Sequence, residues 1–166
     1  MSDPFALAQV NLALAREPLD APLLAEFMAA LAPVNARADA APGFVWRLQT
    51  EAGDATALTV FDGALMVNLS VWETLEDLRA FVFGDPDHLR IMRRRREFFT
   101  KIDLVNALWW VPAGHVLTLA EIEVRYASLR DHGPSPYAFS FRRHFPPPDA
   151  EALGAVDDDD RDLCPA

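Results

Sequence analysis

The segment 65–72 (LMVNLSVW) constrains the fold more than any other, because it is apolar on both sides of a β-strand. Side chains alternate along a strand, so Val67 and its alternate neighbours share one side, and Met66 and Trp72 lie on the other. The segment 5–14 (FALAQVNLAL) is also apolar almost throughout. Strands of this kind are buried on both faces, which predicts that both segments lie in the interior of a sheet.

Apolar residues at spacings of three and four predict helices between and after these strands. Several of the helices begin at a capping signal, in which a Thr or Asp side chain accepts a backbone N–H three residues further on. The predicted caps are Asp20, Thr74, Asp85 and Thr118, and Pro22 would lie in the first turn of the helix after Asp20. Pro33 interrupts the apolar stripe of the first helix and predicts a kink or an end near Leu31.

The resulting order is β-α-β-β-α-β, followed by an extra helix and a short terminal strand. This order is typical of the ferredoxin-like α+β fold, an antiparallel sheet with helices on one face. Because those helices would cover only one face, a second copy of the sheet is the economical cover for the other. We therefore expect a homodimer that forms a dimeric α/β barrel. The domain would span residues 1–148, and the acidic residues 149–166 would be a disordered tail.

Composition excludes several classes of function. The formal net charge of −10 argues against nucleic acid, since phosphate binding needs a basic surface. The single cysteine, Cys164, allows neither a disulfide nor a thiolate metal site within one chain. No segment is long enough to span a bilayer and no leader pattern is visible, so we expect a cytoplasmic protein that does not bind membranes.

The four consecutive arginines at 93–96 cannot all face water if their helix packs on the sheet. On a helical wheel, Arg95 shares an apolar face with His88, and Arg93 lies on the opposite side. His88 is the third residue of this helix, where the helix dipole disfavours an imidazolium, so we expect a neutral imidazole that can accept a proton or bind a metal. The alternatives are an Arg95 that pairs with a carboxylate and a His88 that is only a structural residue.

Amide and hydroxyl side chains interrupt the apolar strands, and a buried amide without a partner costs about 1–3 kcal/mol. They are Gln9, Asn11, Asn68, Ser70 and Asn106. One interpretation is a polar cavity between the sheet and the helices, with Trp72 and either Trp46 or Trp110 as flat walls for a planar ligand. The alternative is that these groups hydrogen-bond one another or the backbone.

Several motifs closely resemble a bacterial family known only as domain of unknown function 3291. They are PGFVWRLQTE, VNLSVWE, RRRREFF, LWWVPAGH and HGPSPYAFSFRRHFPPP, and the resemblance covers roughly residues 5–148. That family has no established activity and is placed among the dimeric α/β-barrel proteins. This superfamily includes cofactor-independent monooxygenases that act on polyketide anthrones, heme-degrading monooxygenases, isomerases and heme peroxidases.

The resemblance implies roles for particular residues. In the heme degraders, an asparagine of the first strand, a tryptophan ending the third and a histidine of the next helix surround the heme. Asn11, Trp72 and His88 stand in comparable elements here. In the anthrone oxygenases, an asparagine four residues before a tryptophan contacts the substrate with help from an arginine, and Asn68, Trp72 and Arg95 are the counterparts.

Three hypotheses remain open at this point. The first is a monooxygenase-like enzyme without cofactor or metal, in which His88 is the base, Arg95 stabilises negative charge and Asn68 holds a substrate oxygen. A planar aromatic or polyketide-like substrate would contact the remaining candidates, which are Asn11, Trp72, Ser70, Trp110 and Asn106. The second is a heme-binding protein with His88 as the axial ligand. The third is a non-catalytic dimeric module with a filled core.

Overall fold

Strands β1 (Phe5–Ala15) and β4 (Leu65–Trp72) pair antiparallel in the interior of one sheet. The structure is a computed structural model that describes residues 4–148. Strands β2 (Phe44–Arg47) and β3 (Thr59–Val60) pair with β4, and strands β5 (Phe99–Thr100) and β6 (Asn106–Pro112) pair with β1. The two apolar segments are therefore interior strands, as predicted, and the sheet has ferredoxin-like α+β order.

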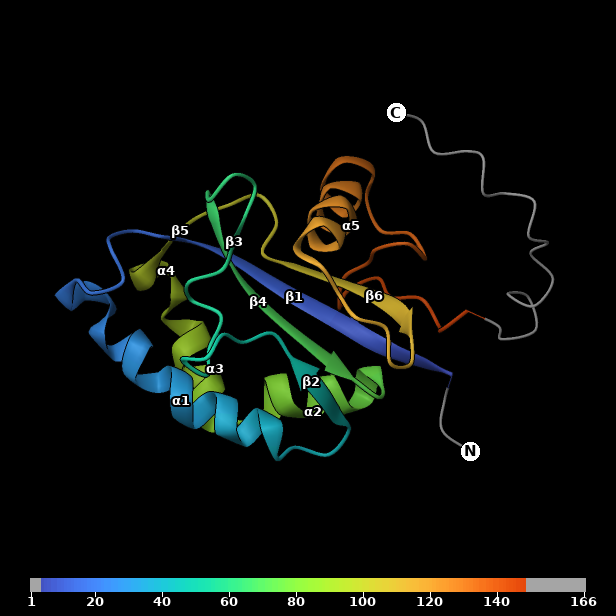
Figure 1. The fold of residues 1–166 in the computed structure, drawn as a ribbon, viewed down its shortest axis with the longest axis horizontal. Coiled ribbons are helices and arrows are strands. Elements are labelled where there is room, and N and C mark those ends of the chain that lie inside the picture. The colour runs from blue at the N-terminus through green and yellow to red at the C-terminus, as the bar shows by residue number, and fades with distance from the viewer. Residues whose placement is uncertain (1–3, 149–166) are drawn as a thin grey trace.

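The helices lie on both sides of the sheet, with α1, α2 and α3 on one side and α5 on the other (Figure 1). Their bounds are η1 (Pro22–Leu24), α1 (Ala25–Asp39), α2 (Leu75–Gly84), α3 (Pro86–Arg93), α4 (Arg95–Phe98) and α5 (Leu119–His132). The predicted cap at Asp20 is wrong, because η1 begins after Ala21 and α1 after Leu24, and neither has a side-chain cap. The other predicted caps are confirmed, since the side chains of Thr74, Asp85 and Thr118 each accept a backbone N–H from the third residue on. These caps fix where α2, α3 and α5 begin.

Helix α5 covers the face of the sheet for which a second copy was predicted. Ile122, Tyr126 and Leu129 of α5 are buried in one cluster with Trp109 of β6 and with the apolar side chains on that face of β1 and β4. Leu48, which follows β2, and Leu58 and Phe61, which flank β3, pack against the same cluster. The premise that helices cover only one face is therefore wrong. The homodimer itself stays a prediction, without this argument in its favour.

Helix α1 continues through Pro33 to Asp39, so the predicted end near Leu31 is wrong. A proline inside a helix leaves the carbonyl four residues earlier, here that of Ala29, without a donor. Ala29 and Pro33 are both exposed, so water can satisfy this carbonyl. The opposite side of α1 keeps its contacts with the sheet and α3 on both sides of the proline.

The helix that carries the arginines ends at Arg93, earlier than predicted, and the short helix α4 follows. The backbone of Arg94 leaves the helical conformation, with φ −96° and ψ 4°. Helix α4 ends at Phe98 and Phe99 is extended, so Phe98 and Phe99 both pack on Phe27, at ring-centroid distances of 6.0 and 4.9 Å. On one continuous helix these two neighbouring side chains would point about 100° apart.

The C-terminal part of the described chain adds little to the sheet. Instead of the predicted short strand after α5, Phe139 alone makes a bridge to Leu108 of β6 through two backbone hydrogen bonds. The predicted acidic tail, residues 149–166, lies outside the described residues. Within residues 4–148, no helix combines the length and the hydropathy needed to cross a bilayer.

Candidate active site

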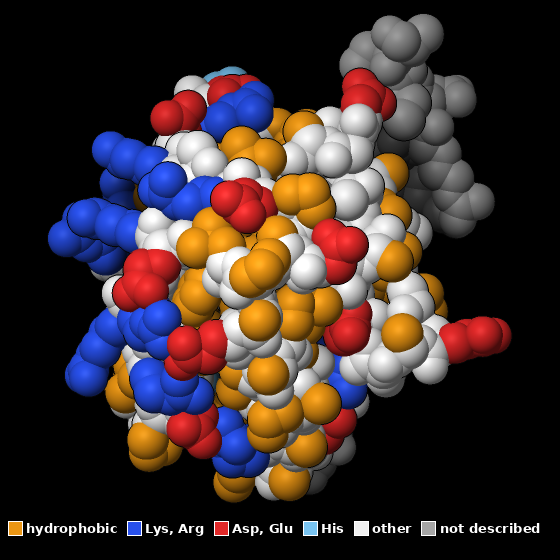
Figure 2. Space-filling model, turned by 90° about the vertical axis from the view of Figure 1, so that its left-hand side faces the viewer, with side chains coloured by type: hydrophobic (Ala, Val, Ile, Leu, Met, Phe, Trp, Pro, Cys, Tyr) orange, Lys and Arg blue, Asp and Glu red, His pale blue; other side chains and the backbone are white. Residues whose placement is uncertain are grey.

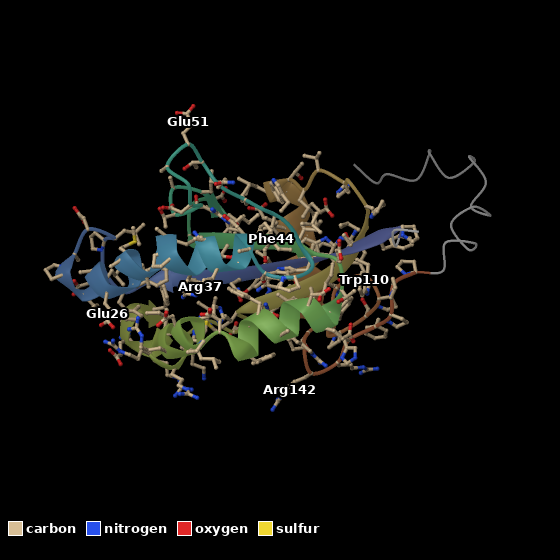
Figure 3. All side chains as sticks on the ribbon, turned by 90° about the horizontal axis from the view of Figure 1, so that it is seen from below. Glu26, Arg37, Phe44, Glu51, Trp110 and Arg142 are labelled. Carbon is tan, nitrogen blue, oxygen red and sulfur yellow. The ribbon has the colours of Figure 1, made fainter. Side chains whose placement is uncertain are left out.

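A cavity of about 150 Å³ lies between the sheet and helices α1 and α3. Most of its lining is apolar, and Phe27, Met66 and Met92 are among the larger side chains. The polar side chains that converge on it from β1, α1, β4, α3 and α4 are Asn11, Asn35, Asn68, His88 and Arg95. Arg47, at the end of β2, and residues 48 and 54–56, on the loop that follows β2, also line the cavity. Glu51 of this loop projects beyond α1 in Figure 3.

Strand register places the amides of this cavity. Asn11 of β1 lies opposite both Asn68 of β4 and Asn106 of β6, so these residues form a row across three adjacent strands. The Asn106 amide donates to Asn11 Oδ1 and to the Val10 carbonyl, both at 3.2 Å. This contact fixes the Asn11 amide with its Nδ2 free, whereas the side chains of Asn68 and Asn35 make no hydrogen bond within residues 4–148. Donors and acceptors therefore remain available to a ligand.

His88 is held at the start of α3 by two contacts. Its backbone N–H donates to Asp85 Oδ1 at 2.7 Å, and its ring Nδ1 lies 3.0 Å from the carbonyl oxygen of Val82. Since a carbonyl oxygen can only accept, Nδ1 carries the proton and Nε2 is left with its lone pair. Nε2 makes no hydrogen bond to any described residue. Burial lowers the pKa of His88 below its ordinary value, although the Val82 hydrogen bond and the Asp85 charge oppose this, so the imidazole is neutral at pH 7.

Arg95 reaches the same cavity from the first position of α4. Its side chain is half-buried and forms neither an ion pair nor a hydrogen bond within the described part of the chain. Burial lowers the pKa of its guanidinium, as expected for a cation that has lost water without gaining a counter-ion. Arg47, which also lines the cavity, differs because it pairs with Asp39 at 2.7 Å.

Trp72 and Ser70, predicted to line the cavity, lie outside it. Trp72 is 1% exposed, its ring stacks on Phe81 at 5.4 Å, and its indole N–H donates to Ser70 Oγ at 2.9 Å. The Ser70 hydroxyl in turn donates to Gln9 Oε1 at 3.0 Å. These polar side chains of β1 and β4 satisfy one another under α2, which is the alternative that the sequence left open.

Trp110 and Asn106 are also absent from the cavity lining. The Trp110 indole N–H donates to the carbonyl of Phe145 at 2.8 Å. In Figure 3, Trp110 lies at the other end of the molecule from Glu26, the neighbour of the lining residue Phe27. Asn106 contacts Asn11 and so acts on the cavity indirectly. Trp46 lies on β2 with 39% of its surface exposed. The aromatic walls come from Phe27 and Phe99 instead.

Asn35 and the loop of residues 54–56 were not predicted to belong to the site. Asn35 carried a signal, since it lies four residues after Leu31 and eight after Phe27, on the apolar stripe of α1. The loop carried none, because its path depends on contacts such as those from Thr56 N–H and Oγ1 to Asp54 Oδ1, at 2.8 and 2.6 Å. Within residues 4–148, no cluster of three or more His, Cys, Asp or Glu side chains could hold a metal ion.

The strand order, and a cavity between the sheet and the helices, define a ferredoxin-like α+β domain with a candidate small-molecule site. More specifically, the chain belongs to the family described as Domain of unknown function (DUF3291), whose family model matches residues 6–155. The resemblance seen in the motifs is thereby confirmed. No curated protein matches the sequence.

Solved structures of similar fold are distant in sequence. A mutant form of SnoaB, a cofactor-independent oxygenase from Streptomyces nogalater, is 20% identical with a TM-score of 0.44, over 68% of this chain and 96% of SnoaB. Rv0793 from Mycobacterium tuberculosis is 15% identical with a TM-score of 0.46, over 68% of this chain and 99% of Rv0793. At this level the similarity concerns the fold alone.

Proposed function

We propose that the protein is a small-molecule enzyme of the monooxygenase-like kind, in which His88 removes a proton from a ring-bearing substrate in the cavity. The observation that carries this proposal is the presence of two unsatisfied groups in one mostly apolar cavity. They are a neutral imidazole with a free Nε2 and a guanidinium without a carboxylate. A general base must be unprotonated and within reach of its proton, and a cation nearby favours the anion that forms.

The remaining side chains fit this chemistry. The free amide groups of Asn11 and Asn68 lie on the floor of the cavity, where they can donate hydrogen bonds to a substrate oxygen as it gains negative charge. The mostly apolar walls lower the local polarity once a substrate fills the cavity, which strengthens these electrostatic interactions. Asn106 orients Asn11 from outside the cavity.

Oxygenation is the reaction class that we propose to follow proton removal. A phenolate or carbanion is electron-rich enough to reduce dioxygen without a cofactor, and cofactor-independent oxygenases occur in the superfamily that the motifs resemble. In the simplest stoichiometry a ring CH₂ becomes a carbonyl, one atom of dioxygen enters the product and the other leaves as water. No cofactor of the protein is required.

An oxygen electrode tests this proposal. Oxygen uptake would be followed with enolisable and phenolic probes of one and three rings, namely 4-hydroxyphenylpyruvate and dithranol. We expect uptake above the buffer rate with at least one of them, and its loss in His88→Gln. His132→Gln, in the last turn of α5, is the matched control and should keep the full rate. Equal uptake by His88→Gln and the unaltered protein would contradict a role for His88 as base.

Heme fits this cavity in chemistry but not in space. The free Nε2 of His88 is a suitable axial donor. However, a cavity of about 150 Å³ is the size that encloses a benzene ring, and a porphyrin contains four pyrrole rings within a larger macrocycle. We therefore expect hemin to give no histidine-type Soret shift. A shift in the unaltered protein that is lost in His88→Gln would favour heme binding instead.

A further inference from the structure

Arg95 is the one arginine of the run 93–96 that lines the cavity, and within the described residues its guanidinium has no acidic partner. Arg94 pairs with Glu26 at 2.5 Å and with Glu97 at 2.8 Å, and Arg90 pairs with Glu26 at 2.6 Å. Figure 2 shows the same pattern at this end of the molecule, where acidic side chains lie among the basic ones. Arg95 is the arginine that points into the cavity, and the chain supplies no counter-ion for it there.

The one carboxylate among the described lining residues forms no ion pair with Arg95. Among the described lining residues this is Asp54, and its Oδ1 accepts hydrogen bonds from the backbone and hydroxyl of Thr56. A half-buried guanidinium with lost hydration and no anion is stabilised by any anion that enters beside it. An anionic ligand can therefore supply the paired negative charge that Arg95 lacks.

The size and the walls of the cavity limit the rest of the ligand. Its volume of about 150 Å³ equals that of an apolar cavity able to enclose benzene. Phe27, Met66 and Met92 supply the aromatic and thioether surface that packs well on a flat ring. Fused systems of three rings exceed this space unless a wall moves.

Two amides from opposite walls complete the polar recognition. Asn35 comes from α1 and Asn68 from β4, and neither side chain has a hydrogen-bond partner in the described chain. A carboxylate or similar oxygen anion has more than one acceptor oxygen, so it can accept from Arg95 and from an amide at once.

We infer that the cavity takes a single-ring aromatic molecule with an anionic oxygen group such as a carboxylate, whose charge is bound by Arg95. This inference rests on the proposed site, and it concerns which substrate is recognised, whereas the proposed function concerns the reaction. Binding can therefore be measured without turnover.

The experiment compares benzoate, its neutral analogue benzamide, and the three-ring anion 9-anthracenecarboxylate by isothermal titration calorimetry. We expect benzoate to bind at least about tenfold more tightly than either of the others, the range of one hydrogen-bonded charge pair. Arg95→Gln should lose about tenfold or more in benzoate affinity, and Arg95→Lys should lose less. Arg93→Gln, at an exposed arginine two residues earlier that does not line the cavity, should leave the affinity unchanged.

Several outcomes would overturn the inference. They are no binding of benzoate by the folded protein, equal binding of benzoate and benzamide, tighter binding of the three-ring anion, or an unchanged affinity in folded Arg95→Gln. Circular dichroism establishes that each variant is folded. Benzoate binding without any oxygen uptake would leave this inference intact and contradict the proposed reaction. Oxygen uptake with dithranol alone would support the proposed reaction and contradict this inference.

Discussion

The imidazole of His88 is tethered to the carbonyl oxygen of Val82, which lies 3.0 Å from Nδ1 across the junction of α2 and α3. Carbonyls in the last turn of a helix lack an intrahelical donor, so the end of α2 at Gly84 leaves Val82 available. The start of α3 brings His88 to it, because the Asp85 cap accepts the His88 backbone N–H. The interruption between α2 and α3 therefore selects the His88 tautomer with a free Nε2.

Stability should depend on pH through His88. Its pKa in the folded protein lies below the ordinary value of 6.5, with Asp85 favouring and Arg37 opposing protonation. As the pH falls below about 6.5, the unfolded chain binds a proton that the folded protein does not, so the free energy of unfolding falls until the folded pKa is reached. Above about 6.5 the contribution is complete.

Urea unfolding of the unaltered protein and of His88→Gln, at about pH 8 and about pH 5, measures this difference. The stability advantage of the unaltered protein should shrink at the lower pH. An NMR titration of the His88 ring supplies the pKa directly. A value above 6.5 would contradict the neutral base on which the proposed reaction depends.

Asp85→Ala should destabilise the protein by about 1 kcal/mol or more, because it removes the N-cap of α3. It also removes the partner of Arg37, whose Nε lies 2.6 Å from Asp85 Oδ2. Asp87→Ala is the matched control, since Asp87 also contacts Arg37, at 3.2 Å, but is exposed and caps no helix. Thermal unfolding of both variants should show the larger loss for Asp85→Ala, and equal losses would contradict the capping role.

Trp72→Ala should cost about 3–5 kcal/mol of stability, the usual range for removing a fully buried aromatic side chain. Because Trp72 does not line the cavity, benzoate affinity in the folded variant should change by less than about threefold. Chemical denaturation and calorimetry measure the two effects separately. A large loss of affinity with little loss of stability would restore Trp72 to the binding site.

Asn106→Ala should weaken turnover although Asn106 does not line the cavity. Its amide holds Asn11 Oδ1 at 3.2 Å, so its loss leaves the Asn11 amide free to rotate. A contact of this kind contributes about 0.5–1.5 kcal/mol, which corresponds to about a two- to tenfold fall in rate. Asn106→Asp keeps an oxygen but not the donor and should not restore the rate. Oxygen uptake by both variants provides the measurement.

Sequence patterns predicted the parts of this fold that depend on local chemistry. The caps at Thr74, Asp85 and Thr118 and the interior strands follow from residue type and spacing alone. The end of α3 does not follow from residue type and spacing, because it depends on the packing of Phe98 and Phe99 against Phe27 of α1. For the same reason, the role of α5 as cover for the second face could not be predicted from its capping box.

The sequence predicted which candidate residues share a face of the sheet or of the helix, but not which of them line the cavity. Alternation along β1 and β4 placed Asn11, Asn68 and Trp72 on one face of the sheet without telling which, and in the structure this is the side of α1–α3. It could not tell that Trp72 lies beneath α2, where Phe44 and Phe81 fill the space beside its ring. The helical wheel brought His88 and Arg95 together although the helix breaks between them, because the break at Arg94 changes the direction of the chain little enough for both to reach the cavity.

Within a few residues, strand β4 contributes both to the cavity and to the core under α5. Met66 and Asn68 border the cavity, whereas Leu69 and Val71 are buried in the layer under α5. Exchanges at Met66 and Asn68 change the surface of the cavity, and exchanges at Leu69 and Val71 change the packing under α5. The same strand can therefore diversify where it meets the cavity while its packing under α5 is kept.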